Sequence, residues 1–232
     1  MEFLLDSADL DEIKEAFEVF PLAGVTTNPT IIAKSKKRMF EQLRAIRAII
    51  GKDAMLHVQV LGERCDLMLL DAEAIVKEID RDVYIKVPLT KEGLKAMKSL
   101  KQQGYKVTAT AVFSYKQSLI ASGIGVDYVA PYISRMMRNG IDAYGEVESM
   151  ATTFKENACS TKILAASFQN SEQMSCCIAM GADCVTAKLA DYYEMIEHPL
   201  TTQAVKGFRE DWQKVYQDKF PFQMGSTQPN TY

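Results

Sequence analysis

Short apolar runs and longer amphipathic stretches alternate along the chain. The runs are rich in Val, Ile and Leu and predict strands at residues 3–6, 24–28, 55–61, 82–88, 106–113, 127–132, 162–168 and 183–188. Apolar residues at helical spacing predict helices at residues 9–20, 36–50, 63–79, 91–103, 114–124, 141–157, 171–180, from about 191, and 200–217. Each predicted strand is therefore followed by a predicted helix.

This alternation predicts the fold class. Strict βα repeats imply parallel strands, and eight of them favour a single (β/α)8 TIM barrel with an extra C-terminal helix. The alternative is an open doubly wound sheet, which usually has fewer strands and often a Gly-x-Gly-x-x-Gly motif that is missing here. No linker-like composition precedes residue 219, so we expect one domain over 1–218. Residues 219–232 are rich in Gln, Pro, Ser, Thr and Asn and predict a flexible polar tail.

Composition narrows the function classes. Of the 232 residues, 47% are hydrophobic, which is enough for a sizeable core. The net charge is -3 and the sequence has no dense basic stripe, so we expect no nucleic-acid partner. No apolar run has the length of a membrane span and the chain starts without a signal-peptide pattern, so we expect a cytoplasmic protein with no membrane partner. The five cysteines lack Cys-x-x-Cys spacing and only two histidines are present, so we expect reduced thiols and no metal site.

One strand carries a chemically unusual residue. In the run 82–88, Lys86 lies on the opposite face from Val83, Ile85 and Val87. Burying an ammonium without a partner is costly, so such a lysine favours the neutral, nucleophilic amine that forms a Schiff base with a carbonyl substrate. For an isolated strand, a lysine that extends to solvent at a sheet edge is the more common arrangement.

Polar residues recur where the predicted strands end. In a barrel these ends share one mouth, which is where active sites lie. The residues are Asp6, Thr26, Asn28, Gln59, Lys86, Thr108, Thr110, Tyr132, Ser167 and Lys188. No carboxylate follows Asp82 in the strand of Lys86, so that strand offers no ion pair to hold the lysine as an ammonium, and the pattern favours imine chemistry.

Several segments resemble the transaldolase family, and in particular its small transaldolase-like and fructose-6-phosphate aldolase subgroup. The most specific are the Thr-Thr-Asn-Pro motif within residues 21–32 and the Lys-Val-Pro motif within 85–88; residues 108–113, 128–135 and 163–168 also match. The resemblance runs from Phe3 to about Tyr216. It implies a (β/α)8 barrel that acts on small-molecule sugar phosphates through a Schiff-base lysine and uses no cofactor.

The resemblance also implies roles for individual residues. The implied catalytic residues are Lys86, Tyr132, Asp6, Gln59 and Thr110. The implied substrate-binding residues are Thr26, Asn28, Arg135, Ser167 and Ala166. Lys86 would form the imine, Tyr132 would act as the general acid/base, and Asp6 would assist proton transfer. Gln59, Thr110 and Tyr132 would hold a catalytic water, while Arg135 and Ser167 would receive the substrate phosphate.

The implied reaction is aldol cleavage and formation of fructose 6-phosphate from dihydroxyacetone and glyceraldehyde 3-phosphate. Gln59 and Tyr132 favour this aldolase, because the transaldolases of the family carry glutamate and phenylalanine at the corresponding positions. A transaldolase of the pentose phosphate pathway, which transfers the dihydroxyacetone unit between sugar phosphates, is the first alternative. A barrel that binds sugar phosphate without catalysis is the second.

Two residues depart from the family pattern. His57 replaces an aromatic hydrocarbon side chain, and we expect a hydrogen-bonded histidine in the barrel interior. Lys188 replaces proline or another uncharged residue. It is either a second mouth cation, which favours the neutral form of Lys86 or binds a phosphate, or a solvated surface residue. The resemblance further implies a homo-oligomer, a decamer of two pentamers, in which helix 200–217 reaches a neighbour; this helix also fits packing on its own barrel.

Overall fold

The computed structural model describes residues 1–224. Two compact units divide the chain, the first formed by Met1–Glu194 and the second by Met195–Tyr232. No helix in the described part of the chain combines the length and the apolar character needed to cross a lipid bilayer.

Eight parallel strands form the first unit's closed barrel. They are β1 (Glu2–Asp6), β2 (Leu22–Thr26), β3 (Met55–Gln59), β4 (Tyr84–Pro88), β5 (Lys106–Val112), β6 (Tyr128–Pro131), β7 (Lys162–Ala165) and β8 (Cys184–Ala187). Strand order follows the chain, and β1 pairs with both β2 and β8, which closes the ring. The prediction of a (β/α)8 barrel is therefore confirmed.

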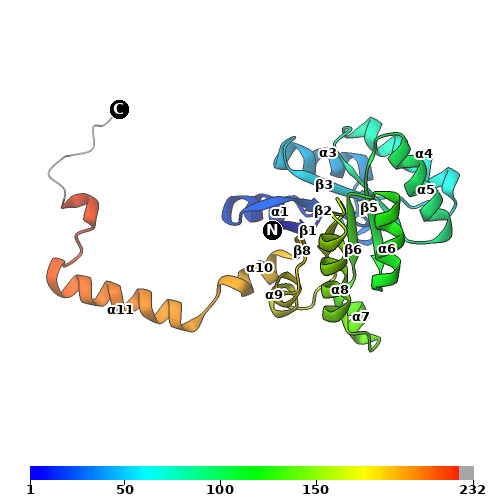
Figure 1. Ribbon diagram of the computed structural model, residues 1–232. Helices are drawn as coiled ribbons and strands as arrows, with labels where there is room; N and C mark the ends of the chain where they lie inside the picture. The colour runs from blue at the N-terminus through cyan, green and yellow to red at the C-terminus, as the bar shows by residue number, and fades with distance from the viewer. Residues whose placement is uncertain (225–232) are drawn as a thin grey trace. The chain divides into compact units, whose positions relative to one another are not determined.

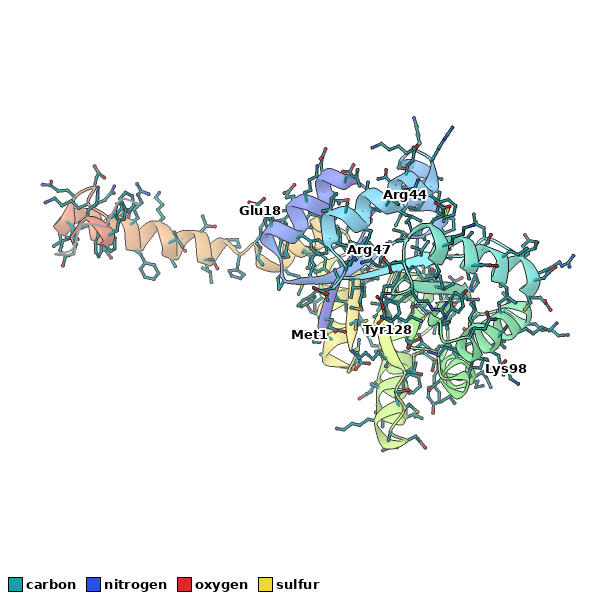
Figure 2. The ribbon with its side chains drawn as sticks, turned by 90° about the horizontal axis from the view of Figure 1, so that it is seen from above. Met1, Glu18, Arg44, Arg47, Lys98 and Tyr128 are labelled. Carbon is teal, nitrogen blue, oxygen red and sulfur yellow. The ribbon has the colours of Figure 1, made fainter. Side chains whose placement is uncertain are left out.

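Helices surround the strands, as Figure 1 shows. They are α1 (Leu10–Val19), α2 (Pro29–Lys34), α3 (Met39–Ile50), α4 (Cys65–Glu78), α5 (Lys91–Gln102), α6 (Tyr115–Ile124), α7 (Ile133–Arg138), α8 (Ala143–Glu156), α9 (Ser171–Ala179) and α10 (Leu189–Ile196). In Figure 2, Arg44 on α3 and Lys98 on α5 project outward, while Tyr128 lies among the strands.

Two short helices, α2 and α7, were not predicted from the hydrophobic pattern. The turn of α2 begins where Asn28 accepts a hydrogen bond from the Ile31 N–H, with Pro29 in the first helical position. The predicted helix at 36–50 accordingly starts later, at Met39. Helix α7 follows β6 directly, and the predicted helix at 141–157 is shortened to α8. Six residues are too few to display a helical repeat, so local capping explains α2 better than periodicity does.

The barrel interior has an apolar lower part and a polar upper part. Outward-facing residues such as Ile85 and Val87 join the main core between strands and helices. Inside the barrel, Leu4, Tyr128, Leu164 and Cys184 form a separate buried cluster near the start of the strands. Farther along the strands the interior becomes polar, with Thr26, His57, Lys86, Thr108 and Thr186 all buried. The apolar layer closes the barrel below, so the polar groups are available only at the mouth.

The second unit contains α11 (Pro199–Tyr216) and a 3-10 helix (Pro221–Gln223). The indole N–H of Trp212 donates to the carbonyl of Lys219 over 2.7 Å, which ties the end of α11 to the residues that follow. The predicted polar tail 219–232 thus includes a short helix. Its remaining residues, 225–232, lie outside the described part of the chain.

Candidate active site

Lys86 lies inside the barrel near the centre of β4 and is only 5% exposed. Its Nζ donates to the carbonyl of Thr27 over 2.8 Å. That carbonyl is fixed in turn, because the N–H and the hydroxyl of Thr27 both donate to the His57 carbonyl, over 2.9 and 3.0 Å. The lysine therefore has a neutral, rigid hydrogen-bond acceptor, and no described carboxylate forms a salt bridge with it.

Asp6 ends β1 and begins a row of three hydrogen-bonded side chains. The Thr26 hydroxyl donates to Asp6 Oδ1 over 2.7 Å and lies 2.7 Å from the Thr186 hydroxyl. Because Thr26 gives its one proton to Asp6, Thr186 is the donor to Thr26. Burial raises the pKa of the Asp6 carboxyl, against the lowering effects of the Lys86 charge, the Thr26 hydrogen bond and the Lys188 charge. A carboxyl shifted in this direction holds a proton more readily, which suits a group that assists proton transfer.

Tyr132 lies directly after β6 and faces β5. Its hydroxyl is 3.0 Å from the Thr110 hydroxyl, and its ring makes an edge contact with Phe113. The guanidinium carbon of Arg135 lies 5.0 Å from the centre of the same ring. A phenol held on three sides in this way is oriented before any substrate arrives.

Backbone contacts bring Arg135 toward the end of β7. The first N–H groups of α7 donate to the carbonyls of Ala166 and Ser167, over 3.0 and 2.9 Å. These bonds satisfy donors that a helix start otherwise leaves unpaired. They also join the turn of α7, which carries the exposed Arg135, to the two predicted substrate-binding residues after β7.

Two non-glycine residues at the mouth adopt left-handed backbone conformations. Ala111, next to Thr110, has φ 56° at a point where the register between β5 and β6 shifts. Ser167, next to Ala166, has φ 63°. Such conformations cost on the order of 1–3 kcal/mol and cluster at functional sites, because the surrounding fold must hold them in place. Both flank predicted site residues.

Gln59 and Asn28 complete the predicted set. Gln59 ends β3 and stands in register with Lys86 on the neighbouring strand, so both side chains share the interior face. Asn28 uses its Oδ1 to cap α2, so its side-chain NH2 group keeps its donor capacity. The cap of α1 is Asp9 rather than Asp6, so the Asp6 carboxyl is not engaged at a helix end.

His57 lies deeper in the barrel than these groups. Its Nδ1 is 2.9 Å from the Thr108 hydroxyl, and its ring stacks on Tyr84 with centroids 4.5 Å apart and planes 9° from parallel. Its Nε2 has no partner among the described residues. Burial, and secondarily the charge of Lys86, hold the pKa of His57 well below its usual 6.5, so the ring is neutral. This matches the expected hydrogen-bonded interior histidine.

Lys188 directly follows β8 and is exposed. Its backbone N–H donates to Asp191 Oδ2 over 3.1 Å, which fixes the chain at the start of α10. Its side chain lines a cavity together with Asp6, at the end of β8 where the barrel opens.

Sequence reasoning missed two contributors, Thr27 and Thr186. Thr186 occupies the same face of β8 as Lys188, two residues earlier, so the alternation within residues 183–188 contained the signal. Thr27 acts on Lys86 through its backbone carbonyl, and no side-chain pattern predicts such a contact.

Known proteins match the sequence of this chain along the whole length of the barrel. The sequence model of the family described as "Transaldolase/Fructose-6-phosphate aldolase" matches residues 3–228. A "Probable fructose-6-phosphate aldolase" of Streptococcus pneumoniae is 41% identical over 213 residues, covering 91% of this chain and 96% of that protein. A "Probable transaldolase" of Geotalea uraniireducens is 38% identical over 215 residues, and one of Geotalea daltonii is 36% identical; each alignment covers 93% of this chain and 99% of the relative.

Proposed function

The chain belongs to the transaldolase/fructose-6-phosphate aldolase family of enzymes, and we propose that it is a class I aldolase which cleaves and forms fructose 6-phosphate through a Schiff base on Lys86. The observation that carries the proposal is the setting of this lysine. It is buried in the polar part of the barrel, it donates to a neutral carbonyl, and no described carboxylate pairs with it. A lysine inside the barrel that no described salt bridge ties down is positioned to attack the carbonyl carbon of a substrate held at the mouth.

The proposed reaction begins when the amine of Lys86 attacks the ketone carbon of the sugar and water leaves. The resulting iminium accepts the electron pair of the bond between the third and fourth carbons as that bond breaks. A base must take the proton of the fourth carbon's hydroxyl, and Tyr132 is our candidate for this general acid/base, acting through a water that it holds together with Thr110 and Gln59. Cleavage of this bond frees glyceraldehyde 3-phosphate and leaves an enamine on Lys86. Protonation of the enamine at the third carbon and hydrolysis of the resulting imine then release dihydroxyacetone.

The other predicted residues bind and orient the substrate in this proposal. Asp6, with its carboxyl held by Thr26, receives substrate hydroxyl groups and assists proton transfer. The side-chain NH2 group of Asn28 donates to a substrate oxygen. Arg135 and Ser167 receive the phosphate of the three-carbon aldehyde, a task that suits the guanidinium fork.

The second candidate is a transaldolase, and the relatives carry both names. Gln59 supports the aldolase, because an amide at this position cannot ionise as the glutamate of the transaldolases does. Product analysis with fructose 6-phosphate separates the two. The aldolase releases free dihydroxyacetone without any aldehyde acceptor. Dihydroxyacetone that appears only as a unit transferred to an added acceptor contradicts the aldolase proposal and supports the transaldolase.

We also propose that the protein is a cytoplasmic homo-oligomer, built as a decamer of two pentamers. Within its own unit, α11 leaves Leu200, Val205, Phe208 and Val215 exposed, and such an apolar helix face gains stability when another surface covers it. Light scattering on the full chain tests the assembly. A monomeric mass at micromolar concentration contradicts it, and Phe208→Glu should lower the mass of an assembly that uses this face.

A further inference from the structure

A cavity of about 570 Å³ opens beside Asp6. Its wall includes the β1–α1 connection, the end of α2 and Lys188, which follows β8. The Asp6 carboxyl is only partly engaged, because its Oδ1 accepts the Thr26 hydroxyl proton while no described residue forms a hydrogen bond with its Oδ2. One oxygen of Asp6 therefore remains available for a proton or for a substrate hydroxyl.

Strand register brings Lys188 close to Asp6. Strands β1 and β8 are neighbours in the barrel, and their last residue pair is Leu5 with Ala187. Asp6 and Lys188 are the next residues along the two strands, so continuation of the same register places them at the same level of the mouth. The cavity that both residues line agrees with this placement.

Backbone contacts hold the two segments in place. The buried side chain of Gln42, on α3, donates to the carbonyl of Ala8, two residues after Asp6. On the other strand, the Lys188 N–H donates to Asp191 Oδ2 over 3.1 Å. The Asp6 carboxyl and the Lys188 ammonium therefore both extend from backbone that the fold has fixed.

The cavity as a whole is electrically balanced. Its wall carries four carboxylates and four lysines, which are Asp6, Asp9, Asp11, Glu12, Lys14, Lys34, Lys37 and Lys188. The effect of a charge on Asp6 depends on its distance, however, and not on this total. Burial raises the pKa of Asp6, and among the lysines of the wall it is Lys188 whose charge lowers that pKa. Lys188 thus acts on Asp6 more strongly than the other cations of the cavity do.

Three further titratable groups surround this pair. Lys86 acts from the barrel interior, and its charge also lowers the pKa of Asp6. Tyr192 on α10 donates its hydroxyl proton to a backbone carbonyl of β1 over 2.7 Å, and burial raises its pKa, so the phenol stays neutral. Burial raises the pKa of Asp191 against the lowering effects of the Lys188 N–H and of the Lys188 charge. Two cations therefore act on Asp6, Lys86 from inside the barrel and Lys188 from the cavity.

We propose that Lys188 is a positioning residue which acts through Asp6, and that its constant positive charge keeps Asp6 ionised at the start of each turnover, ready to take up a proton. The inference rests on the proposed function, because it assigns Lys188 a part in the reaction at Lys86. Lys188 itself touches no substrate in this account. It changes only the balance between the two protonation states of the carboxyl.

The reaction explains why a second cation is useful. The nitrogen of Lys86 carries a positive charge in the iminium and none in the enamine that remains once the carbon–carbon bond has broken. Asp6 then loses one of its two cationic neighbours, and its burial favours the protonated form. The charge of Lys188 does not change during the cycle, so it limits this shift and lets Asp6 release its proton again.

The first test is the pH dependence of kcat for fructose 6-phosphate cleavage by the full-length protein. Lys188→Met removes the charge and keeps most of the side chain, Lys188→Arg keeps the charge, and Lys34→Met, on the same cavity wall, is the matched control. We expect the midpoint of the acid limb to rise by roughly 0.5 to 1 in Lys188→Met, so that kcat on the acid side falls roughly 3- to 10-fold. Lys188→Arg and Lys34→Met should keep the original midpoint. An acid limb that does not move in Lys188→Met overturns the inference.

The second test does not need turnover. Infrared difference spectroscopy follows the band of the protonated Asp6 carboxyl, which is identified by its absence in Asp6→Asn. We expect the pH midpoint of this band to rise in Lys188→Met and to stay in place in Lys188→Arg. A shifted midpoint in a chain that cleaves no fructose 6-phosphate supports the action of Lys188 on Asp6 while the proposed function alone fails. Equal midpoints in the unmodified protein and Lys188→Met overturn the inference and leave the proposed function intact.

Discussion

Removal of the Tyr132 hydroxyl should have a small effect on stability and a large effect on the reaction rate. Tyr132→Phe removes one oxygen, which lies 3.0 Å from the Thr110 hydroxyl. The contacts of the ring with Phe113 and Arg135 remain available to phenylalanine. The folded state therefore loses one neutral hydrogen bond, about 1 kcal/mol of unfolding free energy. In a chain of this size that corresponds to a fall of roughly 2–4 °C in Tm.

The effect on the reaction should be far larger. A positioned general acid/base typically contributes roughly 10²- to 10⁴-fold to the rate, or about 3–5 kcal/mol of activation free energy at about 1.36 kcal/mol for each factor of ten. We therefore expect kcat for fructose 6-phosphate cleavage to fall by that factor in Tyr132→Phe. The assay is the continuous detection of glyceraldehyde 3-phosphate, with Tm measured on the same preparation.

Thr110→Val is the matched control, because it breaks the same hydrogen bond but leaves the phenol in place. We expect a similar stability loss and a rate loss of only about tenfold, since the phenol keeps its proton but loses one orienting contact. Equal rate losses in the two variants, or a Tyr132→Phe variant with wild-type kcat, refute the role of Tyr132 as the proton carrier.

Two further predictions concern buried titratable groups. The folded-state pKa of His57 lies below its unfolded value of 6.5, so stability is fully present above that pH and is lost as the pH falls, by up to about 1.4 kcal/mol per pH unit. The unfolding free energy, measured with urea between about pH 5 and 7, should fall with this slope as the pH is lowered, and His57→Phe should lack that slope. Equal slopes in the unmodified protein and His57→Phe contradict the argument. Burial raises the pKa of Asp6 above 3.8, so its ionised form destabilises the fold at neutral pH. Asp6→Asn, which keeps an acceptor for Thr26, should therefore raise Tm at neutral pH while abolishing turnover; an unchanged or lower Tm counts against this reading.

The barrel could be predicted because its signals are repetitive. Each buried parallel strand is a continuous apolar run, and eight such runs separated by amphipathic helices leave few architectures. The placement of Lys86 followed from the same logic, because alternation alone puts it opposite Ile85 and Val87. Helices α2 and α7 could not be found in this way, since each is shorter than two full helical turns.

The details of the site depend on backbone geometry that a residue pattern does not contain. The acceptor for Lys86 is the carbonyl of Thr27, two strands away in the ring. The left-handed conformation of Ser167 is unusual for a serine, and nothing in the sequence around it signals that backbone. The sequence alone did not decide whether Lys188 lies at the barrel mouth or on the outer surface. The register of β1 and β8 and the cavity that it shares with Asp6 place it at the mouth end of the strands.

The most direct test of the central claim is to trap the imine. The protein is incubated with dihydroxyacetone, reduced with borohydride, digested and mapped by mass spectrometry. We predict that the mass gain of one reduced three-carbon unit falls on Lys86, and that Lys86→Met gains no mass and has no aldolase activity. An adduct on another lysine such as Lys188, or full activity without any adduct, contradicts the account of Lys86 as the Schiff-base residue.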